Sequence, residues 1–209
     1  MPGLKRVRFA VPPFYPSTGT SSSTREYAPP FGYSTRRTGF DRRAETFHSR
    51  SPRIHDLLAY SRHPIIHFDV GLPPTSITSS YTLSRRAMSE PAIEPPVASL
   101  TLSIPHVMWP IIVTPSNGVF VSVADVFDAI YHTLRAQVTE REYRSIRSPS
   151  DLKRVNAAYE HRHRRIRDGY AAHRERQGGV RRIDFLAGHT YFKGLSTSGS
   201  RRSLTLNLS

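Results

Sequence analysis

Residues 122–138 have the sequence Ser122-Val-Ala-Asp-Val-Phe-Asp-Ala-Ile-Tyr-His-Thr-Leu-Arg-Ala-Gln-Val138, which is the most informative run in the chain. Its apolar residues recur three and four positions apart, so an α-helix would carry them on one face. Ser122 and Asp125 form a Ser-x-x-Asp variant of the capping box at the start of this helix. A helix of this length spans about 24 Å and needs a core against which to lay its apolar stripe. The stripe consists of Val123, Val126, Phe127, Ile130, Tyr131, Leu134 and Val138.

Two more helices are expected after this one. Thr139-Glu-Arg-Glu142 is a capping box and predicts a short helix that continues to about Ile146. Ser148-Pro149 supplies an N-cap followed by proline at the first helical position, which predicts a third helix. Gly169 and then Gly178-Gly179 are expected to close the helical region. The buried side of the third helix is predicted to contain Leu152, Val155, Tyr159 and Ile166.

Strands are expected on both sides of the helices. Residues 64–70 and 97–104 are predicted strands, and the second alternates apolar and polar residues. Residues 109–113 and 119–121 flank Asn117-Gly118 and predict a hairpin. Ile183 and Phe185 are expected to return to the sheet as a last strand, and Trp109, the only tryptophan, is expected to anchor the core. These elements predict an α+β fold, with a small, mainly antiparallel sheet and about three helices packed on one side.

Composition divides the chain into three parts. Residues 1–53 are rich in Pro, Ser, Thr, Gly and Arg without apolar periodicity, which predicts a disordered arm. Residues 54–195 are expected to form a single α+β domain. Residues 196–209 are rich in Ser, Arg and Thr, and we expect a flexible tail there.

The chain is strongly basic, with 30 Lys and Arg against 16 Asp and Glu and a formal charge of +14. Up to Arg62 there are 11 basic and 4 acidic residues, from His63 to Val138 there are 3 and 5, and from Thr139 onward 16 and 7. There is no cysteine, which excludes disulfides and thiolate zinc sites. No run of apolar residues is long enough for a signal peptide or a membrane span. We therefore expect an intracellular protein, in the cytoplasm or the nucleus, without membrane contact.

Residues from about Pro64 to Leu195 resemble an uncharacterised family of basidiomycete fungal domains, catalogued only as a domain of unknown function. The resemblance depends on Pro64-Ile-Ile-His-Phe-Asp-Val70, Trp109-Pro-Ile-Ile-Val113, Val138-Thr-Glu-Arg-Glu-Tyr143 and Gly179-Val-Arg-Arg-Ile-Asp-Phe-Leu-Ala-Gly-His-Thr-Tyr-Phe-Lys-Gly-Leu195. It supports the domain limits and implies no activity, cofactor or catalytic residue.

The motifs of known catalytic and cofactor sites are missing from the sequence. Neither glycine-rich phosphate loop is present, and there is no nucleophile elbow. His161 and His163 are two positions apart, so on a helix they point in different directions and do not share an ion easily. His67 and Asp69 could share one face of a strand, but two ligands do not close a metal site. We therefore expect no catalytic, cofactor-binding or metal residue, although a deep pocket lined by His67, Asp69 and Asp184 would indicate an enzyme.

A candidate modification site and a charged cluster complete the sequence features. Arg85-Arg-Ala-Met-Ser89 resembles the substrate of a basophilic kinase, a short pattern that recurs by chance. Asp184 stands beside Arg181 and Arg182, which predicts an ion pair at a strand edge.

The basic third helix and the segment after it are the main candidate for function. The predicted contact residues are Arg162, Arg164, Arg165, Arg167, Arg181 and Arg182. Such a surface fits a non-enzymatic interaction module that meets an acidic protein partner. Sequence-independent nucleic-acid binding through the same helix is the leading alternative, and an unrecognised enzyme is the third. A flat basic face would favour binding, and an exposed apolar groove would indicate a protein partner.

Overall fold

A computed structural model of the chain describes residues 52–80, 82–105, 107–200 and 202–209. The α+β class is confirmed, because within these ranges five α-helices accompany small, mainly antiparallel sheets. Nearly all of the predicted arm lies outside the described residues. At its end, Arg53 already belongs to a strand. None of the helices in the described ranges is long and apolar enough to cross a membrane.

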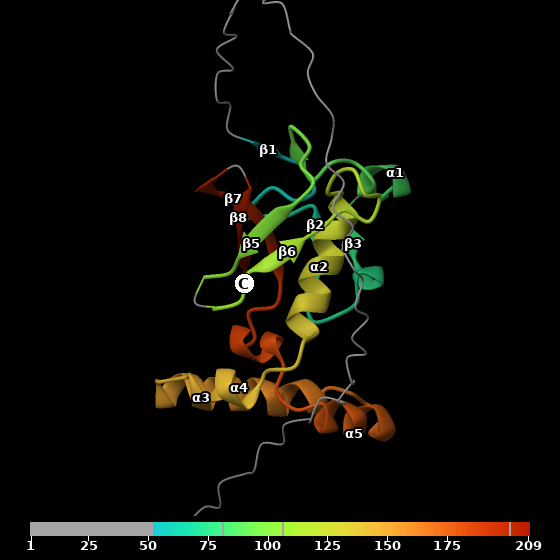
Figure 1. Cartoon of the computed structure of the whole chain (residues 1–209). Coiled ribbons are helices and arrows are strands. Elements are labelled where there is room, and N and C mark those ends of the chain that lie inside the picture. The colour runs from blue at the N-terminus through green and yellow to red at the C-terminus, as the bar shows by residue number, and fades with distance from the viewer. Residues whose placement is uncertain (1–51, 81, 106, 201) are drawn as a thin grey trace, which may run out of the picture. The chain divides into compact units, whose positions relative to one another are not determined.

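The predicted first helix is α2, Val123–Arg135. Its capping box is confirmed: the Ser122 hydroxyl accepts from the Asp125 backbone, and the Asp125 carboxylate accepts from the Ser122 backbone. Most of the apolar stripe is buried in the main core, whereas Tyr131 is half-buried and Val138 lies in a second buried cluster. The Phe127 ring packs edge-on against Phe68 and Phe192, with ring centroids 5.4 and 5.2 Å away. In Figure 1, α2 runs alongside the strands of the main sheet.

The main sheet has four strands in the order β6-β5-β8-β7. They are β5 (Leu100–Ser103), β6 (Ile111–Val113), β7 (Phe192–Ser200) and β8 (Ser203–Leu208). β5 is antiparallel to β6 and β7 to β8, whereas β5 and β8 run parallel. The alternation predicted for residues 97–104 is confirmed over β5, where Leu100 and Leu102 face the core.

The expected flexible tail is instead part of the sheet. β8 lies between β5 and β7, and its alternating residues Leu204 and Leu206 are fully buried. The interpretation from composition was wrong here because it gave the Ser and Thr content more weight than the period-two alternation of the leucines.

The predicted hairpin across Asn117-Gly118 does not form, because β6 pairs with β5. The Asn117 side-chain oxygen accepts from the backbone N–H of Val119 and of Phe120, at 2.8 and 3.0 Å. Because these two N–H groups are bonded within a local turn, they are not available to pair with another strand, and α2 follows shortly after.

The remaining helices form a second group. α3 (Glu140–Arg144) and α4 (Pro149–Arg164) start at the predicted caps, Thr139 and Ser148. The third helix ends earlier than expected, and α5 (Gly169–Gln177) starts anew because the Asp168 carboxylate accepts from two backbone N–H groups at its beginning. Figure 1 shows α3, α4 and α5 beyond the ends of the strands.

The expected strand at residues 183–186 is a 3-10 helix, η2 (Arg182–Leu186), which packs against α4. The Asp184 carboxylate accepts from the Arg181 backbone at 2.9 Å and turns the chain. A strand would bury Ile183 and Phe185, which are two residues apart, but the buried apolar residues are Ile183 and Leu186. Their spacing of three is that of a 3-10 helix.

Short elements complete the fold. β1 (Arg53–Ile54) pairs with β4 (Ile93–Glu94), and β2 (Ile66–His67), part of the predicted strand at 64–70, pairs with β3 (Thr78–Ser79). η1 (Pro74–Ser76) and α1 (Arg85–Met88) lie in the connections.

Candidate functional site

The six predicted contact arginines divide into two groups. Arg164, Arg165 and Arg167 are exposed. The side chains of Arg162, Arg181 and Arg182 are only 14%, 16% and 25% exposed, and each has a carboxylate partner. The six therefore do not form one contact surface.

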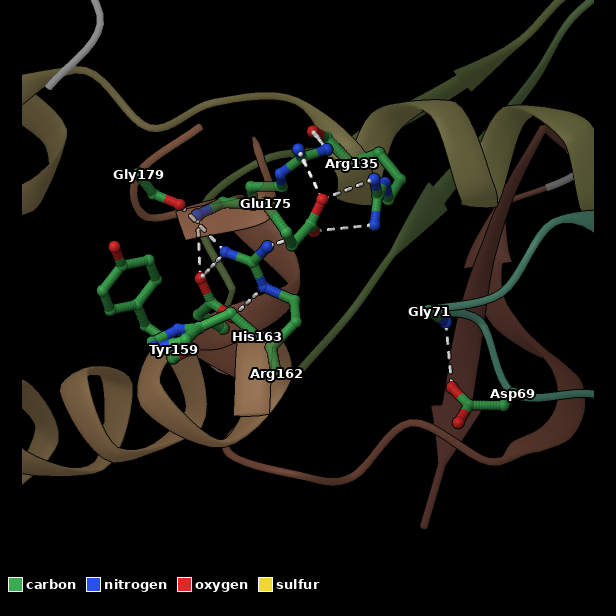
Figure 2. Close-up of polar contacts among 10 residues, drawn as sticks. Asp69, Gly71, Arg135, Tyr159, Arg162, His163, Glu175 and Gly179 are labelled. Atoms are coloured by element: carbon green, nitrogen blue, oxygen red, sulfur yellow. Dashed lines mark hydrogen bonds and ion pairs between the residues drawn. The ribbon is translucent and has the colours of Figure 1, made fainter. Parts of the chain in front are cut away.

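Arg162 lies on the side of α4 that faces η2 and holds two carboxylates (Figure 2). Its Nε and Nη2 donate to the two carboxylate oxygens of Asp184, at 2.9 and 3.0 Å. Nη2 also donates to the Gly179 carbonyl at 2.9 Å, and Nη1 donates to Oε1 of Glu175. The guanidinium carbon lies 5.6 Å from the centroid of the Tyr159 ring. The ion-pair partners predicted for Asp184 were wrong: within the described residues its carboxylate pairs with Arg162, while Arg181 contributes only its backbone N–H and Arg182 pairs with Glu142.

Glu175, on α5, accepts from three arginines. Arg135, at the end of α2, donates to both of its oxygens, at 3.0 and 3.1 Å. Arg181 donates to Oε2 at 3.0 Å, and Arg162 donates to Oε1. Glu175 thus joins α2, α4 and the segment before η2. We call Arg135, Arg162, Arg181, Glu175 and Asp184 the arginine–carboxylate network.

The network holds three positive and two negative groups in a largely buried place. Burial alone would raise the pKa of Glu175, but the charges of Arg181, Arg135 and Arg162 hold it below its ordinary value of 4.5. Burial alone would lower the pKa of Arg162, but Asp184 and Glu175 raise it. Burial and the charges of Arg135 and Arg162 lower the pKa of Arg181. The network has one more arginine than carboxylates. The buried Nε of Arg181 has no hydrogen-bond partner among the described residues, so we take Arg181 to be the arginine whose charge is not balanced.

The lowered pKa of Glu175 predicts acid-sensitive stability. A carboxylate with a folded pKa below its unfolded value stabilises the fold fully above about pH 4.5 and loses that contribution as pH falls through the folded pKa. The pKa values of Glu142 and Asp125 are also lowered, so they act with the same sign. We expect the free energy of unfolding, from urea titrations followed by Trp109 fluorescence, to fall as the pH drops below about 4.5.

An arginine substitution distinguishes the contribution of Glu175 to the acid sensitivity from that of other carboxylates. Arg181→Met removes a charge that lowers the pKa of Glu175, so the decline below about pH 4.5 should become shallower. Arg85→Met removes the same charge from an exposed position and should leave the decline unchanged. Equal slopes for the two variants would contradict this account of Glu175.

Arg182 belongs to a separate cluster around Trp109. Its guanidinium carbon lies 5.0 Å from the centroid of the indole ring, and Phe185 packs edge-on against that ring at 4.8 Å. The indole Nε1 donates to Oε1 of Glu142 at 2.5 Å, while the other oxygen of Glu142 accepts from Thr139 and caps α3. Burial would raise the pKa of Glu142, but these hydrogen bonds lower it. The prediction that Trp109 anchors the core is confirmed, because it lies in the buried cluster of the helical part.

The three exposed arginines among the predicted contact residues lie at the junction of α4 and α5. Arg165 and Arg167 have no ion-pair partner within the described ranges, and Arg164 pairs with Glu160 at 3.0 Å. Tyr170 is 72% exposed, and the guanidinium carbon of Arg174 lies 5.9 Å from its ring centroid. We call Arg164, Arg165, Arg167, Tyr170 and Arg174 the basic patch.

Sequence reasoning missed Arg135 and Glu175. Nothing in the sequence near Glu175, which stands between Arg174 and Arg176, indicates that it faces inward. For Arg162 a signal did exist, since Val155, Tyr159 and Arg162 follow spacings of four and three and share one helix face.

The two histidines of α4 and the residues near β2 make no hydrogen bond or ion pair to the network among the described residues. His161 is exposed, whereas His163 is buried with Nδ1 3.0 Å from the Tyr159 carbonyl. Asp69 accepts from the Gly71 backbone at 2.9 Å, as Figure 2 shows. His67 and Asp69 border a depression of about 740 Å³ that Asp184 does not line.

Neither a metal site nor the kinase site gains support. No group of three His, Asp or Glu within the described segments could hold a metal ion. Ser89 follows α1, and its hydroxyl donates to the Arg85 carbonyl at 3.0 Å; its phosphorylation stays a prediction.

The model of a family of unknown function, DUF6699, matches residues 66–203. The chain belongs to this family. The DUF6699 region runs from β2 to the first residue of β8 and contains the whole network and the basic patch. No curated protein and no solved structure matches the chain. The resemblance to a domain of unknown function is confirmed, and the basidiomycete origin stays a prediction.

Proposed function

We propose that this DUF6699 domain is a non-enzymatic interaction module whose basic patch contacts an acidic protein partner. The cytoplasmic or nuclear location predicted from the sequence is part of the proposal. The contrast between the two groups of arginines supports it. Arg162, Arg181 and Arg182 face inward and pair with carboxylates, whereas Arg165 and Arg167 of the patch have no ion-pair partner among the described residues and Arg164 pairs only with the half-buried Glu160.

The patch also has the composition of a binding surface. Arginine and tyrosine are enriched at the energetically important positions of protein interfaces. Tyr170 is exposed and has a guanidinium near its ring, so an aromatic group and several cations are presented together.

Nucleic acid is the second candidate, and the arrangement of aromatics favours it less. Single-strand binders stack successive bases on several aromatic side chains along a basic channel. Within the described residues the other exposed tyrosines, Tyr60 and Tyr191, lie beside β7 and not on the patch. A single aromatic among arginines is better suited to a protein contact.

Fluorescence anisotropy of the full chain with labelled polyanions tests the proposal. The probes are poly-glutamate of about 20 residues, with RNA and duplex DNA of similar length as competitors, titrated across salt. We expect poly-glutamate binding that weakens by about tenfold or more when Arg164, Arg165 and Arg167 are replaced by alanine. Tyr170→Ala should weaken it further.

A second triple variant controls for net charge. Arg53, Arg85 and Arg86 are also exposed, and replacing them with alanine removes the same charge from another region. This control should change the affinity by less than about twofold. Equal losses in the two triple variants would overturn the role of the patch. The nucleic-acid hypothesis would be established instead if the chain bound RNA or DNA in preference to poly-glutamate, with an affinity that falls steeply with salt, and if the patch variant lost this binding.

A further inference from the structure

A groove of about 910 Å³ lies at the other end of α4 from the basic patch. Its walls come from the segment between β5 and β6, the α3–α4 turn and the first turns of α4, and the segment from η2 to β7. Residues at the end of β8 also border it. Its volume is within the range of sites that bind ligands and side-chain clusters.

The groove opens where the two apolar clusters of the domain meet. Ile104 and Leu206 belong to the cluster of the sheet, and Val155 belongs to the cluster around Trp109. Val107 packs against both clusters and lines the groove. Met108, at its border, is 55% exposed and has a flexible side chain that adapts to a bound surface. The floor can thus take up apolar side chains.

The charged residues of the groove are almost all basic. Arg62 and Arg147 are exposed and Lys193 is half-buried, and none of them has an ion-pair partner in the described part of the chain. The one acidic side chain in the lining, Asp151, already pairs with Arg154. An occupant that complements the groove must carry negative charge as well as apolar groups.

We propose that this groove binds an acidic peptide segment of a partner protein, with one or more large apolar side chains on the floor and Asp or Glu beside Arg62, Arg147 and Lys193. The chain's own first 50 residues carry nine Lys and Arg against three acidic residues, and a second copy carries +14, so both have the wrong charge. A nucleic acid would leave the aliphatic floor without apolar contact. The groove and the basic patch are separate surfaces, and the inference does not depend on the patch.

Selection of a displayed library of random peptides, about 12 residues long, against the full chain tests this inference. We expect enrichment of peptides that combine large apolar residues with Asp and Glu. A selected peptide without tryptophan should also change the emission of Trp109, because Phe185 lines the groove and contacts the indole ring.

Substitutions at the groove and at the patch give distinguishable outcomes. Arg62→Glu combined with Arg147→Glu, and separately Met108→Asp, should each weaken a selected peptide by about tenfold or more, since all three residues are exposed and the fold should persist. Arg164→Glu combined with Arg165→Glu makes the same charge change on the patch and should alter the affinity by less than about twofold.

Three results would overturn the groove site: enrichment of peptides without acidic residues, no enrichment, or affinities that the groove variants leave unchanged. A dimer in sedimentation that Met108→Asp dissociates would assign the groove to a second copy instead. If the patch variants lose poly-glutamate binding and the groove variants leave the affinity of the selected peptide unchanged, the proposed function stands and the groove site fails.

Discussion

A chain that ends at Leu195 is expected to lose its cooperative fold, although the sequence alone suggests a domain ending there. The cut removes β8, which lies between β5 and β7 and joins them in the sheet. Leu204 and Leu206 are fully buried, and truncating a buried leucine to alanine alone costs about 2 to 5 kcal/mol. Because a domain of this size is stable by about 5 to 15 kcal/mol in total, losing both leucines and the pairing on two sides exceeds what it can tolerate.

Circular dichroism and urea unfolding of residues 1–195 and of the full chain measure this effect. Substitutions within the full chain test the same strand without a truncation. Leu204→Asp, on the buried face, should abolish the cooperative transition, whereas Thr205→Asp places the same charge on the half-exposed face and should be tolerated. A cooperative unfolding transition in the shortened chain would show that β8 is dispensable.

The α2 helix and the β8 strand show what the sequence could and could not predict. α2 combines a local cap with an apolar stripe over 13 residues, so neighbours in sequence are enough to define it. β8 has only six residues, and its parallel partner β5 lies about 100 residues earlier in the chain. Its leucines alternate as in a strand, but pairing between such distant segments depends on tertiary contacts that composition does not reveal.

The direction of each arginine was the other part that the sequence left open. Arg162 and Arg164 are two residues apart on one basic helix, and they point to opposite environments. The spacing from Val155 and Tyr159 places Arg162, not Arg164, on the inward face of the helix. Without a known buried partner, however, an arginine is expected to be exposed. The partners Glu175 and Asp184 come from later segments, so only the folded chain brings them together.

Arg162→Met is expected to destabilise the domain by about 3 to 5 kcal/mol, the cost of leaving a buried charge without its partner. Arg162 is the network arginine whose guanidinium pairs with both carboxylates. Without it, the side chain of Asp184, which is only 2% exposed, keeps the Arg181 backbone N–H as its remaining donor among the described residues. Urea unfolding followed by Trp109 fluorescence gives the free-energy difference.

Arg181→Met should cost less than about 1 kcal/mol, even though the two arginines are buried to a similar extent. Arg181 is the third cation beside two carboxylates, and burial together with the charges of Arg135 and Arg162 lowers its pKa, so its charged form is poorly accommodated. Glu175 keeps Arg135 and Arg162 after the substitution. Equal losses for Arg162→Met and Arg181→Met would mean that the network does not discriminate between its arginines.

The excess of one cation in the network fixes the sign of a double-mutant cycle. Glu175→Gln alone leaves three cations with one carboxylate and should cost about 3 to 5 kcal/mol. Adding Arg181→Met removes one uncompensated cation, so the double variant should be more stable than the sum of the single effects predicts. Glu140→Gln is the matched control, because Glu140 pairs with Arg144 on the exposed surface and its loss should change stability by less than about 0.5 kcal/mol. Additive effects of Glu175→Gln and Arg181→Met would show that the excess charge is accommodated elsewhere, and the network would then be a set of independent pairs.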